Sequence, residues 1–103
     1  EDAEAIENIE AIAAVGLDIL WVGTHDLAAS YGLLGQTSHP RVLAAGDRVV
    51  AAGKRHNIAI GFPARNPDDA KDALRRGYRA IGYGSAETYV VQHGRAFLES
   101  VRD

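Results

Sequence analysis

The sequence has no cysteine among its 103 residues, so no disulfide can cross-link the chain, and any core must be packed from apolar side chains alone. It also lacks an apolar run near the ~20 residues that a bilayer-spanning helix needs. Positive charge is scarce, since 11 Lys and Arg stand against 14 Asp and Glu, a formal net charge of −3. This balance argues against nucleic acid and against an acidic membrane surface as partners.

The composition that remains is that of an ordinary globular protein, with 47% hydrophobic and 24% charged residues. No linker or low-complexity segment divides the chain, so we expect one domain over residues 1–103. The first residues, Glu-Asp-Ala-Glu, are acidic where a signal peptide would be basic, and we expect a cytoplasmic protein.

Helices are predicted from apolar spacing and from the residues that begin and end them. Isoleucines at helical spacing predict a helix over residues 3–15 that stops at Gly16. Pro40 suits the first position of a helix over about 40–56, with His39 ordering the loop or capping the helix and Asn57 as its stop.

Two further helices follow the same logic. Asn66 is expected to cap a helix that begins at Pro67 and ends at Gly77, and Ser85 to cap a final helix. The residues expected to face inward from this last helix are Tyr89, Val90, Gly94, Phe97, Leu98 and Val101.

Three short apolar runs are expected to be strands: LDILWVG at 17–23, IAIGF at 58–62, closed by Pro63, and RAIGYG at 79–84. In the first run, apolar residues occupy positions that point to both faces of the strand, which is typical of a strand covered on both faces. Alternating strands and helices predict a parallel α/β sheet with its chemistry at the carboxyl ends of the strands. Since a barrel needs eight strands, and an open sheet of three would have exposed edges, we expect this chain to be part of a larger structure.

The most informative stretch is Gly23-Thr24-His25-Asp26, at the end of the first strand. Its backbone N–H groups could bind an anion, and the Asp26 carboxylate is a ligand for a hard divalent ion. Glu1 lies just before the first helix, where a preceding strand would finish, and could supply a second carboxylate. The alternative, which pattern alone favours, is that Asp26 caps a short helical turn over 26–30 and that Glu1 is a solvated acid.

The stretch ILWVGTHDLAASYGLLGQTSHPRV, residues 19–42, resembles the strand-six signature of the HpcH/HpaI aldolases, a family of metal-dependent, pyruvate-type class II aldolases. In that signature Gly-x-x-Asp-Leu is followed by a short Gly-containing loop and then His-Pro. EDAEAIENIEAI, residues 1–12, resembles the segment after strand five, and RRGYRAIGYGSAE, residues 75–87, the strand-eight region. The resemblance implies parallel βα units that form strands 6–8, with flanking helices, of the C-terminal part of a TIM (β/α)8 barrel.

The resemblance also implies a site. Glu1 and Asp26 match the carboxylates that hold a divalent Mg, Mn or Co ion, and the backbone amides of the loop Gly23, Thr24, His25 and Asp26 match the site for the substrate carboxylate. The substrates implied are a 2-oxo acid such as pyruvate and an aldehyde, joined or separated through an enolate that the metal stabilises. The residues expected to line the pocket are Trp21, Pro63 and Tyr83.

This chain departs from the family pattern in three ways. Thr24 and His25 stand where many members have Pro followed by Ala or Asn, and Gly84-Ser85 where some have Asp or Thr. The family's general base histidine and enolate-stabilising arginine precede the segment matched by Glu1, so we expect no catalytic residue in this chain. His25 is the one candidate acid or base, and the alternative is a solvent-facing side chain whose backbone binds substrate.

Two functions follow. The first is a fragment of a carbon–carbon lyase that cleaves or forms 4-hydroxy-2-oxo acids. The second is a non-catalytic α/β module that keeps only the strand-end anion and metal site. Because a partial barrel leaves a sheet edge and an apolar face uncovered, we also expect a homo-oligomer or assembly with the missing N-terminal half.

Overall fold

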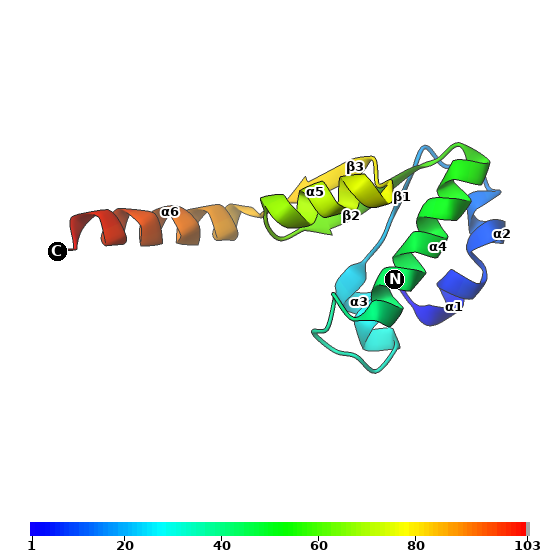
Figure 1. Ribbon diagram of the computed structural model, residues 1–103, viewed down its shortest axis with the longest axis horizontal. Coiled ribbons are helices and arrows are strands. Elements are labelled where there is room, and N and C mark those ends of the chain that lie inside the picture. Colours follow the sequence, from blue (N-terminus) through cyan, green and yellow to red (C-terminus); the bar gives the residue numbers. More distant parts are fainter. Residues whose placement is uncertain (103) are drawn as a thin grey trace.

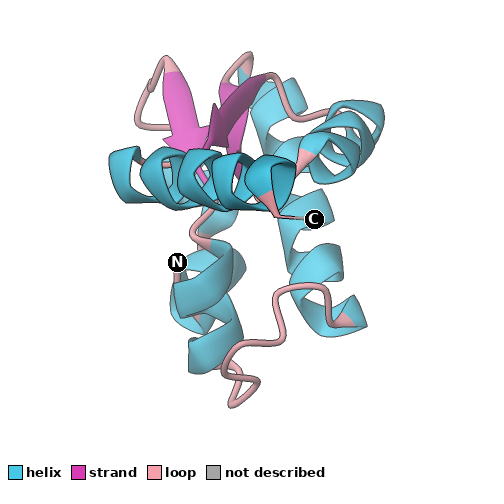
Figure 2. Ribbon diagram, turned by 90° about the vertical axis from the view of Figure 1, so that its left-hand side faces the viewer, coloured by secondary structure: helices cyan, strands magenta, loops and turns pink. Residues whose placement is uncertain are grey.

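The computed structural model describes residues 1–102 and is elongated, with extents of 57 × 29 × 21 Å (Figure 1). Three strands form one parallel sheet in the order β1-β2-β3: β1 is Ile19–Trp21, β2 is Ala59–Ala64 and β3 is Ala80–Tyr83. Leu20 pairs with Ile60 and Phe62 pairs with Ile81, so the three strands place their carboxyl ends at one edge. Figure 2 shows the strands side by side, with α6 and the C-terminus nearest the viewer.

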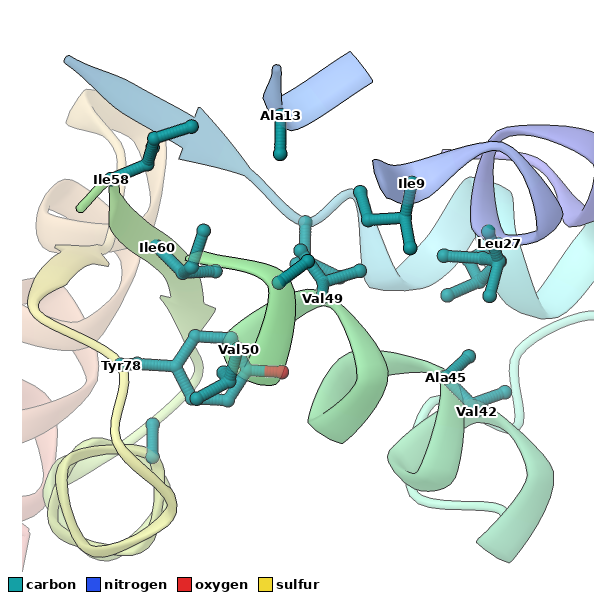
Figure 3. Packing of buried hydrophobic residues seen from close by; sticks show 14 of the residues in the cluster. Ile9, Ala13, Leu27, Val42, Ala45, Val49, Val50, Ile58, Ile60 and Tyr78 are labelled. Carbon is teal, nitrogen blue, oxygen red and sulfur yellow. The ribbon is translucent and has the colours of Figure 1, made fainter. Parts of the chain in front are cut away.

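The helices are α1 (Ala3–Glu7), α2 (Ile9–Ala13), α3 (Thr24–Ser30), α4 (Pro40–His56), α5 (Pro67–Arg76) and α6 (Ala86–Val101). None of those within the described residues is long and apolar enough to cross a membrane. The core lies where α4 packs against the sheet and against α2, and its members meet there from every part of the chain before α6 (Figure 3). Leu27 and Val42 are its largest fully buried side chains.

The predicted caps of α4, α5 and α6 are confirmed, whereas the first helical segment ends at Ala13 and not just before Gly16. His39 Nδ1 accepts from the N–H of Arg41, the Asn66 side chain accepts from Asp69 N, and Ser85 Oγ accepts from Thr88 N. Asn57 ends α4 in the left-handed conformation, with φ of 56°, and Gly77 ends α5 with φ of 105°. The residues that begin helices accept a hydrogen bond from a nearby backbone N–H, and the residues that end them adopt the left-handed conformation, as expected for these residue types.

The predicted helix over 3–15 is wrong in its continuity. Asn8 leaves helical geometry, with φ of −96° and ψ of 13°, and separates α1 from α2. Asparagine is a poor residue for a helix interior, which explains why the break falls there. The apolar spacing still holds across the break, because Ile6, Ile9 and Ala13 are all buried.

The first strand is shorter than predicted, and only one of its faces is covered. Ile19 and Trp21 are 55% and 47% exposed, because no helix within residues 1–102 covers the face of the sheet to which they point. Val22, on the other face, is buried against the core. β1 is also an edge strand of this sheet.

Pro63 lies within β2 rather than after it. Alternate residues of β2 face β1, since Ala59 N donates to Asp18 O and Gly61 O accepts from Val22 N. Pro63 is the next residue of this series and lies past Trp21, where β1 has ended. Proline has no N–H to donate, but at this position β1 offers no strand residue to pair with, so no hydrogen bond between β1 and β2 is lost.

The final helix does not pack as predicted. α6 projects away from the sheet (Figure 1), and no residue of it is buried. Its apolar stripe is open to solvent, with Phe97 61% and Val90 72% exposed. The helix is tied to the body at its first turn, where Tyr89 donates its hydroxyl to the Tyr83 carbonyl at 2.8 Å.

Candidate functional site

Two carboxylic acids meet at the carboxyl end of β1, on either side of Gly23. A side-chain carbon placed on Gly23 would lie 3.1 Å from Glu1 Cβ and 3.8 Å from Asp26 Oδ2. The structure therefore brings Glu1 and Asp26 to the same point, although 24 residues lie between them in the sequence. Glycine at position 23 leaves this approach open.

Glu1 is positioned by contacts that follow it directly. The Asp2 side chain accepts from Ala5 N at 2.7 Å and so caps α1. The N–H of Ala3 donates to Ser30 Oγ at 2.9 Å, which joins the start of α1 to the last residue of α3. These bonds hold the segment around Glu1 against the helix that carries Asp26, and sequence reasoning did not identify Ser30.

Asp26 does not cap a helix, and that alternative is wrong. α3 begins two residues earlier, at Thr24, with Gly23 as its cap and no side-chain capping hydrogen bond. Asp26 therefore lies in the first turn of α3 and is exposed to solvent. Its carboxylate is not committed to the backbone and remains available to a ligand.

The backbone of this loop offers N–H groups beside the carboxylates. The first helical hydrogen bond of α3 runs from Leu27 N to Gly23 O at 2.9 Å. The N–H groups of Thr24, His25 and Asp26 precede it, and groups in that position have no acceptor within a helix. Thr24 is buried, with 7% of its surface exposed, so the loop is held firmly to the body.

His25 is exposed, and no hydrogen bond joins its side chain to another group within residues 1–102. This placement is that of the solvent-facing alternative. A role for His25 as an acid or base stays a prediction.

Trp21 lies across one face of the sheet, below the carboxylates. A side-chain carbon on Gly61 would overlap the Trp21 ring, and one on Gly82 would lie 2.8 Å from Cη2. Only glycine at these two positions lets the indole lie flat over β2 and β3. Trp21 and Glu1 also line the same small hollow, of about 50 Å³.

Pro63 and Tyr83 lie at a second hollow, which we call the rim hollow, of about 330 Å³ at the carboxyl ends of the strands. Its lining residues are His25, Pro63, Ala64, Arg65, Tyr83, Gly84 and Thr88. The predicted pocket residues are thus divided, with Trp21 beside Glu1, and Pro63 and Tyr83 at the rim.

Arg65 is the functional candidate that sequence reasoning missed. Its Nε donates to Asp69 Oδ2 at 2.6 Å, and its Nη2 donates to Asp69 Oδ1 at 3.0 Å and to Ser38 Oγ at 3.2 Å. Hydrogen bonding from Arg65 lowers the pKa of the Asp69 carboxyl below its usual value. An arginine at a strand end, four residues before an aspartate, is a signal that could have identified the pair.

The donor set at Gly23 fits a hard divalent cation. Mg²⁺ is commonly bound through one or two carboxylates, with waters and substrate oxygens completing its coordination. Glu1 and Asp26 are such a pair, whereas the described part of the chain gathers no group of three or more His, Cys, Asp or Glu side chains that could hold a metal. The remaining ligands would come from water and substrate.

Known proteins match nearly the whole of this chain. The family model described as HpcH/HpaI aldolase/citrate lyase matches residues 1–93. A hydroxypyruvate/pyruvate aldolase of Paraburkholderia phytofirmans is 38% identical over 103 residues, which are 99% of this chain and 40% of that protein. A 5-keto-4-deoxy-D-glucarate aldolase of Klebsiella pneumoniae is 40% identical over 86 residues, 82% of this chain and 34% of that protein.

Solved structures agree with the sequence matches. A HpcH/HpaI aldolase/citrate lyase family protein of Burkholderia cenocepacia superposes with a TM-score of 0.94 at 39% identity, covering 100% of this chain and 40% of that one. A HpcH/HpaI aldolase of Desulfitobacterium hafniense gives 0.90 at 26% identity, with the same coverage.

These matches confirm the predicted fold class, in which the βα units are the C-terminal part of a TIM barrel. The chain spans about 40% of the length of the P. phytofirmans relative. It belongs to the HpcH/HpaI aldolase/citrate lyase family.

Proposed function

We propose that this chain is the C-terminal part of a carbon–carbon lyase that cleaves or forms 4-hydroxy-2-oxo acids. The observation that carries the proposal is that Glu1 and Asp26 converge beside Gly23, next to the backbone amides of Thr24 and His25. Two carboxylates with adjacent N–H donors suit a divalent ion together with the carboxylate of a 2-oxo acid.

Glu1 and Asp26 would hold the ion, which when bound would act as a Lewis acid toward the 2-oxo group. In this proposal the amides of Thr24, His25 and Asp26 bind and orient the substrate carboxylate, because they are the first N–H groups of α3 and have no acceptor within the helix. Trp21 covers Gly61 and Gly82 on the neighbouring strands and lines the hollow beside Glu1. The metal is Mg²⁺, Mn²⁺ or Co²⁺ in this proposal, since all three accept oxygen ligands.

The substrates we propose are pyruvate, or a close 2-oxo acid, and an aldehyde. The relatives support this choice, since their names join aldolase activity to hydroxypyruvate or pyruvate in one case and to 5-keto-4-deoxy-D-glucarate in the other. We also propose that the 103 residues bind pyruvate but do not turn it over. The family resemblance assigns the general base and the charge-stabilising arginine to the part of the barrel before Glu1.

Metal titration with and without pyruvate tests the proposal. Asp26→Ala should remove metal-dependent pyruvate binding, measured by calorimetry, because one of two protein ligands is lost. Asp18→Ala is the matched control, since Asp18 is an exposed aspartate at the opposite end of β1. Unchanged binding in Asp26→Ala would refute the proposed site. Binding without any turnover by the full-length protein would favour a non-catalytic module instead.

We further propose that this chain forms a homo-oligomer or assembles with the N-terminal half of the barrel. The open apolar stripe of α6 and the uncovered face of β1, with Phe97 61% and Ile19 55% exposed, support this. Exposed apolar faces of this kind are often covered by a partner or by another part of the same protein.

A further inference from the structure

The rim hollow is bounded by the ends of all three strands. His25 follows β1, Pro63 and Arg65 lie at the end of β2, and Tyr83 ends β3. Its volume of about 330 Å³ is ample for a small organic acid. His25, which lines the rim hollow, and Asp26, which lies beside Glu1, both belong to the first turn of α3 at the carboxyl end of β1.

The chemistry of this lining favours an anion. No carboxylate borders the rim hollow among the described residues, whereas Arg65 contributes a guanidinium, His25 an imidazole, and Tyr83 and Thr88 hydroxyl groups. The Thr88 hydroxyl is already paired with Ser85 Oγ at 2.9 Å. Arg65 is therefore the strongest hydrogen-bond donor among the residues that line this hollow.

Arg65 is also held in place before any ligand arrives. Its Nε and Nη2 both donate to the Asp69 carboxylate, and Nη2 also donates to Ser38 Oγ. Over residues 1–102 no hydrogen bond is made by Nη1, and 54% of the side-chain surface is exposed. A guanidinium fixed on one side and free on the other loses little rotational freedom when it binds.

We propose that Arg65 is a specificity-determining residue, and that its free Nη1 binds a carboxylate carried by the aldehyde substrate. This inference rests on the proposed lyase function. The aldehyde must reach the reacting carbon from the carboxyl ends of the strands, and the rim hollow lies on that side. A neutral aldehyde would make no comparable contact with Arg65. Since Asp69 balances the charge of Arg65, the preference comes from a directed hydrogen bond, and we expect it to be moderate.

The test uses the full-length protein with saturating pyruvate and Mg²⁺, and compares two acceptors of similar size, glyoxylate and glycolaldehyde. Arg65→Met should raise the KM for glyoxylate by about tenfold and change that for glycolaldehyde by less than about twofold. Arg65→Lys should give an intermediate KM for glyoxylate, because it keeps the charge and loses the fixed geometry. Ser38→Ala removes one bond of Nη2 while Asp69 still holds Nε and Nη2, so it should raise the KM for glyoxylate far less than Arg65→Met does and leave the KM for glycolaldehyde unchanged.

Equal losses with both acceptors in Arg65→Met and Arg65→Lys, or no loss with either, would overturn the role of Arg65. The same holds if Ser38→Ala reproduces the effect, since Arg65 would then act through the loop. Metal-dependent exchange of the pyruvate methyl protons with deuterium separates this inference from the lyase proposal, because the exchange needs no aldehyde. If the unsubstituted protein lacks this exchange, the lyase proposal fails; if exchange occurs but Arg65 does not discriminate, only the present inference fails.

Discussion

The placement of Trp21 across two glycines makes a quantitative prediction. Replacing Gly61 by alanine would put a methyl group inside the indole ring, so the ring must leave the sheet. Gly61 is buried in a central strand, and its backbone cannot shift without breaking pairing with both β1 and β3. We therefore expect Trp21 to move and the sheet to stay.

The size of the effect follows from the burial of Trp21. The residue is 47% exposed, so about half of its surface is buried against the sheet. A fully buried tryptophan covers up to ~250 Å², and half of that at ~25 cal/mol per Å² gives about 3 kcal/mol as an upper limit for Gly61→Ala. If the displaced indole ring packs against other residues, the loss of stability would fall toward about 1 kcal/mol, the lower end of the range for overpacked sites.

A double-mutant cycle with Trp21→Ala isolates this clash. Trp21 is the single tryptophan of the chain, so its emission should shift to longer wavelength in Gly61→Ala as the ring enters water. Urea denaturation followed by circular dichroism should show a loss of stability in Gly61→Ala alone. In the Trp21→Ala background the same change should be neutral or slightly stabilising, because alanine loses less conformational entropy than glycine on folding.

Two results would refute the reasoning. One is an unchanged emission spectrum in Gly61→Ala, which would mean that the ring does not lie on Gly61. The other is an equal loss of stability with and without Trp21, which would place the clash elsewhere.

Two further predictions concern an ion pair and the final helix. Since Arg65 lowers the pKa of Asp69, the pair stabilises the fold above the unfolded carboxyl pKa of about 3.9, and this contribution is lost as pH falls through the lower folded value. Asp69→Asn should therefore reduce urea stability at pH 7 and have a smaller effect near pH 2; equal effects at both would contradict the pairing. Phe97→Ser should weaken self-association measured by light scattering, whereas Glu99→Ser, also exposed on α6, should not. An unsubstituted chain that stays monomeric at high concentration would contradict the proposed oligomer.

The candidate site could be predicted from the sequence only in part. Gly23 and Asp26 were found because a glycine and an acid follow an apolar run, a pattern contained in a few adjacent residues. Glu1 was proposed from its place just before the first helix, where a preceding strand would end, and the family resemblance then matched it to a metal-binding carboxylate. Arg65 was missed because its meaning depends on Ser38 and on the rim hollow, which join segments distant in the chain.

The fold shows the same division. Caps such as Asn66, Ser85 and Asn57 act on backbone groups within three or four residues, so their identities determined where helices begin and end. The sequence by itself also determined the parallel α/β class through the order of strands and helices.

Only the tertiary structure decided which apolar faces are covered. Periodicity shows that Trp21 and Phe97 lie on apolar faces, but burial depends on whether another segment packs there. In this chain Trp21 finds Gly61 and Gly82, while the α6 stripe meets no other segment among residues 1–102. The meeting of Glu1 with Asp26 was decided in the same way, because it depends on α1 and α3 both packing on α4 and on the hydrogen bond from Ala3 N to Ser30 Oγ.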